Sequence, residues 1–404
     1  MKFNNLQLSF SLTVLISCLV LTGTLVQSCQ NEKESLIISD GSRFEPGDFY
    51  PHFSWEVTPQ YFMFGNGDRV LYPEEVSFIA EKTDFICIEK SHGYKMLGGA
   101  ELGARHDAAA FKKARPGIKV LFYFNSAYAW PFTSYSKNFT SENIEDYPEL
   151  KEFLIIDPET GELAHRRNTF FFDVLNPEFR EWWVETVAKG VRESNCDGAF
   201  IDQMHGFFWL REDKKEEVHR AMGDMMASLK ERIGPDKILL GNNACDEIAK
   251  YVYPVIDANM FEHYNTQRAS KENLLQEWDD MLNIAKAGKI SVFRFGVEIE
   301  GTRLENAGRQ ERSDEMAKLS QERLEFYLAC YLIGAQPYSY FQYGWGWRLD
   351  TGPLVDYPEL LRPLGAPREA YERVSPEAWE FTREFEHASV WLDTEKREGK
   401  ITWH

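Results

Sequence analysis

Short apolar runs alternate with amphipathic stretches along most of the chain. Runs such as Phe85–Ile88 and Gly198–Ile201 have the length and composition of buried strands, and stretches with helical periodicity separate them. This alternation predicts parallel βαβ units. We expect eight strands, at residues 61–64, 85–88, 120–124, 198–201, 238–240, 258–261, 290–295 and 337–341. The pattern therefore predicts an α/β protein with a single (β/α)8 barrel.

Two segments depart from the repeating pattern. Residues 126–172 are long for a strand–helix connection, and the turn sequence Asp157-Pro-Glu-Thr-Gly161 divides two extended pieces. We predict a decorated loop that contains a hairpin, and long loops in compact folds are usually functional. Near the C-terminus, two apolar pieces flank a Glu-Gly turn. They predict a β-hairpin that packs on the barrel.

The N-terminus has the pattern of a lipoprotein signal peptide. Lys2 precedes an apolar run at residues 8–26, which ends at Val26-Gln27-Ser28-Cys29. We expect cleavage before Cys29, acylation of that cysteine, and an exported protein anchored to the cell envelope by this lipid alone. A plain secretory signal with an incidental cysteine is the alternative. The predicted division is a signal peptide at 1–28, a tether at 29–50, the barrel at 51–350 and an extension at 351–404.

Composition narrows the possible partners. The formal net charge of −19 argues against nucleic acid, which needs a basic face. No Gly-rich phosphate loop and no GxSxG motif occurs, so we expect no cofactor. Four cysteines remain after the signal region, and we predict that they are buried free thiols because none has CxxC spacing: Cys87, Cys196, Cys245 and Cys330.

Candidate chemistry lies at the ends of the predicted strands. In a (β/α)8 barrel the carboxyl ends of the strands meet at one mouth, where active sites form. The polar residues at these ends are Asn66, Glu89, Asn125, Asp202, Asn243, Glu262, Glu298 and Tyr340. Several carboxylates at one mouth suit cleavage of a glycosidic bond, which needs one carboxylate at the anomeric carbon and one carboxylic acid for the leaving oxygen.

Asp202 is the strongest candidate, because it follows four residues of a strand that has no structural need for a terminal acid. The alternative is a helix N-cap. Glu262 ranks second, since it ends a similar run before His263. Glu89 and Glu298 are weaker candidates for substrate binding, or ion-pair partners of residues such as Lys90 and Arg294.

Histidines and tryptophans near the strand ends extend the predicted mouth. His92, His205 and His263, together with the acids, could suggest a metal, but the chain has no HxH after the first strand and no HExxH. We therefore predict no metal and keep a metal-dependent hydrolase only as an alternative. The tryptophans that follow strands three, four and eight could stack on sugar rings: Trp130, Trp209, Trp345 and Trp347.

Several segments resemble a family of hypothetical glycoside-hydrolase-like barrels from bacterial genomes. They are Phe53–Glu56, Ile88–Lys90, Phe172-Asp173 before Asn176–Glu178, and Asp197–Asp202. More distantly they resemble retaining barrels of the α-galactosidase and dextranase type. The resemblance implies a nucleophile at the end of strand four and an acid/base at the end of strand six, which correspond to Asp202 and Glu262. It also adds Asp173 to the residues expected near the substrate.

The sequence thus predicts a retaining glycosidase that acts on a polysaccharide or oligosaccharide. Retention predicts carboxyl groups about 5–5.5 Å apart, whereas inversion predicts about 6.5–9.5 Å. A catalytically inactive sugar-binding lipoprotein that uses the same mouth is the main alternative.

Overall fold

The structure is a computed structural model that describes residues 36–263, 268–297 and 309–404. The predicted signal peptide, the predicted lipidation site Cys29 and the predicted site residue Glu298 lie outside the described residues. Within the described part of the chain, no helix is long and apolar enough to cross a membrane.

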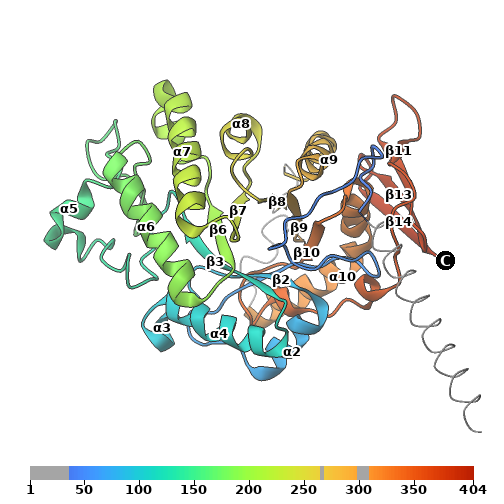
Figure 1. Cartoon of the computed structure of the whole chain (residues 1–404), viewed down its shortest axis with the longest axis horizontal. Helices are drawn as coiled ribbons and strands as arrows, with labels where there is room; N and C mark the ends of the chain where they lie inside the picture. Colours follow the sequence, from blue (N-terminus) through green and yellow to red (C-terminus); the bar gives the residue numbers. More distant parts are fainter. Residues whose placement is uncertain (1–35, 264–267, 298–308) are drawn as a thin grey trace, which may run out of the picture.

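Eight parallel strands form the centre of the molecule (Figure 1). Each strand pairs in parallel with its neighbours, in the order β1 (Phe62–Phe64), β2 (Phe85–Ile88), β3 (Lys119–Asn125), β6 (Gly198–Asp202), β7 (Ile238–Asn242), β8 (Ala258–His263), β9 (Ile290–Phe295) and β10 (Ser339–Tyr343). Backbone hydrogen bonds join the first strand to the last: Tyr61 N donates to Phe341 O at 2.9 Å, and Phe341 N donates to Pro59 O at 2.8 Å. The sheet therefore closes on itself, and the predicted (β/α)8 barrel is confirmed.

Helices surround the sheet (Figure 1). They are α2 (Pro73–Lys82), α3 (Tyr94–Leu97), α4 (Ala100–Ala114), α5 (Pro148–Lys151), α6 (Pro177–Ser194), α7 (Lys215–Ile233), α8 (Ala249–Val252), α9 (Lys271–Lys286) and α10 (Arg309–Gly334). The start of α6 shows why the sequence folds as it does. Asn176 caps the helix by accepting from the backbone of Glu178 at 2.8 Å, and Pro177 occupies the first turn. One turn later, Trp183 is fully buried and donates to the carbonyl of Asn125 at 2.9 Å.

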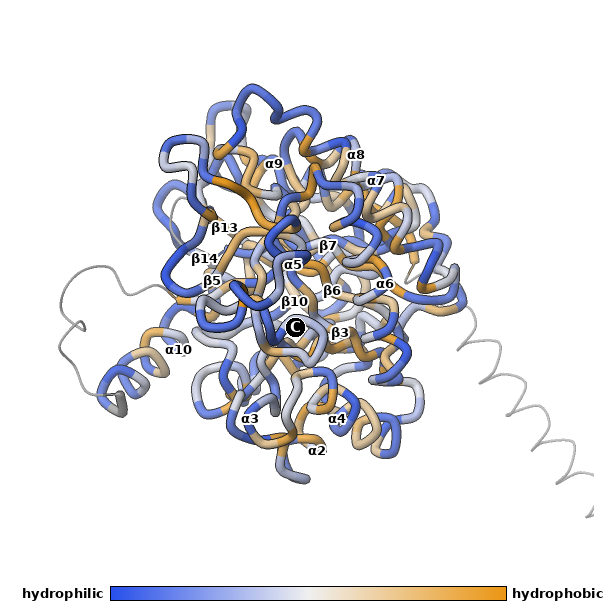
Figure 2. The backbone as a smooth tube through the Cα atoms, turned by 90° about the vertical axis from the view of Figure 1, so that its left-hand side faces the viewer, coloured by the Kyte–Doolittle hydropathy of each residue, from blue (hydrophilic) through white to orange (hydrophobic). Residues whose placement is uncertain are grey.

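Side chains alternate between the inside and the outside of the barrel, as strand geometry requires. Leu121 and Tyr123 of β3 belong to one buried cluster, whereas Phe122 and Phe124 pack in another with Trp183 of α6. Figure 2 shows hydrophobic strands at the centre and hydrophilic segments at the periphery. Because of this alternation, residues two apart on a strand point to the same face of the sheet, and those at the carboxyl end of the inner face reach the mouth.

The decorated loop after β3 contains the predicted hairpin. Ile156 and Leu163 form an antiparallel bridge, and Asp157 N donates to Glu162 O at 2.8 Å across the turn. A second hairpin follows, made of β4 (His165–Arg166) and β5 (Thr169–Phe170). The prediction of a hairpin in this loop is confirmed.

The C-terminal region forms a larger sheet than the predicted hairpin. Four antiparallel strands pack beside α10 (Figure 1): β11 (Glu372–Arg373), β12 (Glu380–Glu384), β13 (Ala388–Asp393) and β14 (Glu398–Trp403). The two additional strands escaped prediction because β11 is very short and β12, with the sequence Glu-Phe-Thr-Arg-Glu, is mostly charged. Arg383 of β12 is buried and donates to the carbonyls of Leu332, Ile333 and Ala335 at the end of α10. This contact ties the sheet to the barrel.

The four cysteines in the described part of the chain are free and buried, as predicted.

Candidate active site

Asp202, the last residue of β6, is held by donors on both carboxylate oxygens. Oδ2 accepts from the Tyr123 hydroxyl at 2.6 Å and from Asn125 Nδ2 at 3.2 Å. Oδ1 accepts from the backbone N–H of Gln203 at 2.8 Å and from Asn242 Nδ2 at 2.9 Å. Burial, with a further contribution from Asp202, raises the pKa of Tyr123 well above its ordinary value, so its hydroxyl remains a donor at neutral pH. These donors fix the orientation of the carboxylate.

Glu262 on β8 lies beside Asp202, and a single side chain touches both. Asn242 Nδ2 on the intervening strand β7 lies 2.9 Å from Asp202 Oδ1 and 3.1 Å from Glu262 Oε2. The two carboxylate oxygens are therefore no more than about 6 Å apart. Asn242 is buried, so its amide forms a fixed bridge between the two carboxylates.

A buried arginine lies behind Glu262. Arg294 of β9 has Nη1 3.6 Å from Glu262 Oε1, and its guanidinium carbon lies 3.8 Å from the centre of the Trp347 ring. Burial lowers the pKa of Arg294, and the charge of Glu262 opposes that shift. The arginine is therefore held between an acid and an aromatic face. Trp347 follows β10, as predicted for a tryptophan at the mouth.

Glu89 and Lys90, directly after β2, form an ion pair at the same mouth. Burial alone would lower the pKa of Lys90, but Glu89, followed by Asp202 and Glu262, outweighs burial and raises it. The Lys90 ammonium lies 5.3 Å from the centre of the Tyr123 ring and 5.8 Å from that of Trp130. Lys90 is thus a cation close to three carboxylates, in addition to Arg294 beside Glu262.

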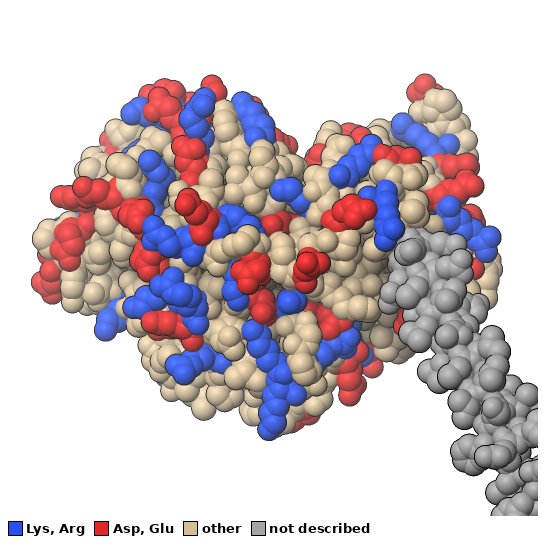
Figure 3. All heavy atoms as spheres, viewed as in Figure 1, with Lys and Arg blue, Asp and Glu red and all other residues tan. Residues whose placement is uncertain are grey.

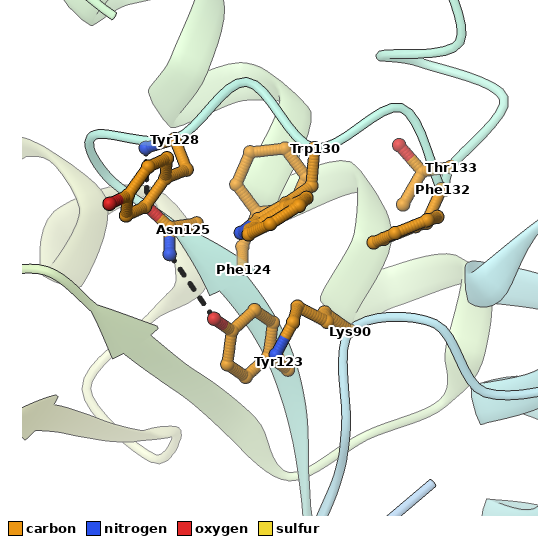
Figure 4. A pocket seen from close by; sticks show the side chains of 8 residues that line it. All are labelled: Lys90, Tyr123, Phe124, Asn125, Tyr128, Trp130, Phe132 and Thr133. Carbon is orange, nitrogen blue, oxygen red and sulfur yellow. Dashed lines mark hydrogen bonds between the residues drawn. The ribbon is translucent and has the colours of Figure 1, made fainter. Parts of the chain in front are cut away.

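A pocket opens beside Asp202 (Figure 4). We call it the aromatic pocket; it is lined by Lys90, Tyr123, Phe124, Asn125, Tyr128, Trp130, Phe132 and Thr133. The Trp130 and Phe132 rings are nearly parallel, at 11°, with centroids 5.5 Å apart. Since Tyr123 and Asn125 both line the pocket and donate to Asp202, a ligand in it would contact the groups that hold that carboxylate. Figure 3 shows acidic and basic side chains interspersed over the face in view.

The structure brings together five of the predicted site residues, namely Asp202, Glu262, Glu89, Asn125 and Trp130. Their catalytic and binding roles stay predictions, because position alone does not demonstrate chemistry.

Asn243 lies one residue from the position that contacts the carboxylates. It has a left-handed backbone, with φ of 50°, and its Oδ1 accepts from the backbone N–H of Glu262 at 2.9 Å. Its neighbour Asn242 makes the contact expected of Asn243. The period-two pattern of β7 contained this signal, since Ile238, Leu240 and Asn242 alternate onto the same face.

Two further predictions are corrected by strand direction and register. Tyr340 is the second residue of β10, near the opposite end of the barrel, and its hydroxyl donates to the His52 carbonyl at 3.2 Å. His263 follows Glu262 on the strand and so points to the outside, where it is buried and pairs with Glu277 of α9. Neither side chain faces the mouth.

Other predicted residues have structural partners around the mouth. Asp173 forms a two-pronged ion pair with Arg211, at 2.6 and 2.8 Å, and both residues line a second surface pocket. Trp345 has its ring against Gly352. His205 packs between Phe208 and His219, with ring centroids 6.1 and 6.0 Å away.

Tyr123 was missed because it lies two residues before the final polar residue of β3, and Asn242 because the prediction chose the adjacent Asn243. Tyr123 shares the inward face of β3 with Asn125, and Asn242 shares that of β7 with Leu240, so the alternation was the available signal.

A closed (β/α)8 barrel with two carboxylates at the ends of β6 and β8, on either side of β7, and an aromatic pocket beside Asp202 defines a glycoside-hydrolase-type site. The chain belongs to Hypothetical glycosyl hydrolase family 15, which it matches over residues 112–389. This match confirms the family resemblance and assigns the chain to the glycoside hydrolases.

Solved structures with similar folds share little sequence with this chain. One is the glycoside hydrolase domain of PelA from Pseudomonas aeruginosa, with 16% identity, a TM-score of 0.42, and coverage of 65% of this chain and 90% of that chain. Another is an α-amylase from Anoxybacillus, with 16% identity, a TM-score of 0.46, and coverage of 84% and 87%. A third is Amy13B from Eubacterium rectale, with 13% identity, a TM-score of 0.47, and coverage of 86% and 89%. No curated protein matches the sequence.

Proposed function

We propose that this protein is a retaining glycosidase that cleaves a polysaccharide or oligosaccharide. Asp202 attacks the anomeric carbon as the glycosidic C–O bond breaks, and Glu262 gives its proton to the leaving oxygen. In the second step Glu262 takes a proton from water, and that water displaces Asp202 from the anomeric carbon. The observation that carries this proposal is the Asn242 amide, which touches both carboxylates.

The shared amide supports the short separation of a retaining pair. The two oxygens that Asn242 contacts, Asp202 Oδ1 and Glu262 Oε2, are within about 6 Å of each other. The carboxyl groups of a retaining pair lie about 5–5.5 Å apart, and those of an inverting pair about 6.5–9.5 Å apart, which leaves room for a water. A sugar bound to Asp202 would then place its leaving oxygen next to Glu262.

The division of roles follows from the hydrogen bonds. Asp202 accepts four donors and is held in one orientation, which suits a group that must stay ionised and aligned for attack. Glu262 accepts a hydrogen bond from Asn242 on Oε2, while its Oε1 lies at 3.6 Å from Arg294. Oε1 of Glu262 is thus held less tightly than Oε2, so Oε1 is better placed to exchange a proton with the leaving group.

The aromatic pocket supports a sugar as the ligand. Sugar rings have apolar faces that stack on aromatic rings and hydroxyl groups that need polar partners. Trp130 and Phe132 supply flat faces, while Lys90 and Asn125 supply donors (Figure 4).

Kinetics of two variants test the assignment. Asp202→Asn removes the nucleophile and should lower kcat by at least about 10³-fold, equivalent to about 4 kcal/mol. Glu262→Ala should lower kcat by a similar factor on natural glycans. The loss of kcat should be far smaller on an aryl glycoside whose leaving group needs no proton. Azide should restore turnover to Glu262→Ala and yield a glycosyl azide with the configuration of the substrate.

Two results would contradict the proposal. Near-normal turnover by Asp202→Asn would remove Asp202 from the nucleophile's role. Failure of the wild type to hydrolyse any glycan, together with sugar binding that is lost on Trp130→Ala, would favour the alternative of an inactive sugar-binding protein.

A further inference from the structure

Three metal-ligating side chains meet beside the candidate active site, between the loops that follow β6 and β7. His205 comes three residues after Asp202, and Cys245 and Asp246 come shortly after Asn242. One ligand atom from each of the three lies within 4.8 Å of the other two. We propose that His205, Cys245 and Asp246 form a Zn²⁺ site that ties these two loops together. The site is independent of the proposed glycosidase chemistry.

The spacing of the ligand atoms fits a tetrahedral ion. Zn–S bonds of about 2.3 Å and Zn–O bonds of about 2.0–2.2 Å place a sulfur and an oxygen about 3.5 Å apart at a tetrahedral angle. Cys245 Sγ lies 3.6 Å from Asp246 Oδ2. The ligand atom of His205 lies within 4.8 Å of the other two, so binding would draw it inward by no more than about 1.3 Å to reach the tetrahedral spacing. Thiolate, imidazole and carboxylate together are a donor set that Zn²⁺ accepts, with a fourth position left for water.

His205 has a nitrogen that needs a partner. Its Nδ1 is buried and makes no hydrogen bond. Buried polar atoms in folded proteins are almost always paired, so this unpaired nitrogen, in a ring that also interacts with the Asn243 backbone, supports a ligand role for His205 beside the thiol and the carboxylate. Burial also lowers the pKa of His205, which keeps its ring in the neutral form that binds metals.

The backbone around Cys245 is arranged to bring adjacent side chains together. Asn243 and Asp246 have left-handed backbones, with φ of 50° and 59°. Such conformations cost free energy in residues other than glycine and concentrate at functional sites. The Cys245 thiol donates to the Asn243 carbonyl at 3.5 Å, while the Asn243 side chain holds the backbone of Glu262. One turn thus connects the proposed metal site to the candidate acid/base.

The net charge of the cluster with its thiol deprotonated favours a divalent cation. Burial, reinforced by Asp246, raises the pKa of Cys245 to about 12, so the thiol is protonated until a metal displaces the proton. The metal-bound cluster would contain a thiolate and a carboxylate. Arg268, whose Nη1 lies 3.9 Å from Cys245 Sγ, and the more distant Lys215 are the neighbouring cations. Arg268 offsets only one of the two negative charges next to the ion.

Titration of the purified protein with Co²⁺, a spectroscopic substitute for Zn²⁺, tests the site directly. We expect one Co²⁺ per chain, with a thiolate-to-metal absorption band in the near ultraviolet that added Zn²⁺ removes. Cys245→Ser should abolish the band, while His205→Ala and Asp246→Asn should weaken Co²⁺ binding at least tenfold. Glu247→Gln is the matched control, because Glu247 is the adjacent exposed acid and pairs with Lys215 at 2.7 Å. It should bind Co²⁺ like the wild type.

Absence of the thiolate band in the wild type, or an unchanged band in Cys245→Ser, would overturn the proposal. Asp246→Asn tests the ligand set in a variant that should fold normally, because Asp246 is exposed and its substitution leaves the core intact. Equal Co²⁺ affinity in Asp246→Asn and Glu247→Gln would also overturn the proposed ligand set. None of these readouts depends on glycan hydrolysis, so failure of the metal site and failure of the glycosidase are distinguishable.

Discussion

At the scale of single residues, the site is defined by donors that point at one carboxylate. Tyr123 and Asn125 reach Asp202 from β3, and Asn242 reaches it from β7. The Tyr123 hydroxyl is the shortest of these contacts, at 2.6 Å. Hydrogen bonds to a charged group contribute about 1.5–3 kcal/mol, so this hydroxyl should matter for the alignment of the carboxylate.

We expect Tyr123→Phe to lower kcat/KM about 10- to 100-fold, because the lost hydrogen bond leaves Asp202 less well oriented. The measurement is steady-state kinetics on the glycan that the wild type cleaves. Tyr340→Phe is the matched control, since Tyr340 is also a buried tyrosine but donates to the His52 carbonyl near the other end of the barrel. Equal losses in both variants would show that Tyr123 acts through stability alone.

The sequence could indicate Asp202 and Glu262 because an acid after an apolar run has no structural role in a buried strand. It could not indicate which of two adjacent asparagines contacts them. Asn242 is the last residue of β7 and faces the carboxylates, whereas Asn243 follows the strand, and its left-handed backbone turns its side chain toward the backbone of Glu262. Strand register, rather than residue type, decides this difference.

At the scale of secondary-structure elements, helix α9 contains a partly buried acid whose protonation affects stability. Asp280 lies in α9, where burial, with further contributions from Glu277, Asp279 and Asp246, raises its pKa from 3.8 to about 6. The folded protein therefore keeps a proton on Asp280 that the unfolded chain loses at lower pH. Stability falls as pH rises from about 4 to 6, since the native state binds more protons in that window.

We expect Asp280→Asn to stabilise the protein at pH 8 by about 1 kcal/mol, a Tm increase of about 2 °C, and to have little effect at pH 4. The value allows for solvent screening of a side chain that is only partly buried. Thermal unfolding at both pH values measures it. Asp279→Asn, at the exposed neighbouring position of α9, controls for removal of one negative charge. A Tm increase of the same size at pH 4 and pH 8 would contradict the assignment.

Element prediction succeeded where periodicity was strong and failed where it was weak. The barrel strands and the hairpin around Asp157–Gly161 follow from apolar runs and turn residues. The strand β12 did not, because its fold depends on contacts far away in sequence, such as those of Arg383 with the end of α10. Strand β12 forms because of tertiary packing, and the local sequence pattern does not reveal that packing.

At the scale of the whole molecule, a barrel enzyme carries a proposed lipid anchor at its N-terminus. The segment that would carry the anchor lies outside the described residues, and the proposed acylation of Cys29 is based on the sequence pattern that precedes this cysteine. In cells grown with labelled palmitate, the wild-type protein should incorporate the label and Cys29→Ser should not. Cys18→Ser changes another cysteine of the same segment and should still be labelled. Labelling of Cys29→Ser would place the lipid elsewhere.

The stereochemistry of hydrolysis distinguishes a retaining pair of carboxylates from an inverting one. Proton NMR recorded early in the cleavage of a glycan, before mutarotation, reports the anomeric configuration of the first-formed product. Asp202 and Glu262, linked by the Asn242 amide at 2.9 and 3.1 Å, predict a product with the same configuration as the substrate. A first-formed product of opposite configuration would contradict the retaining pair.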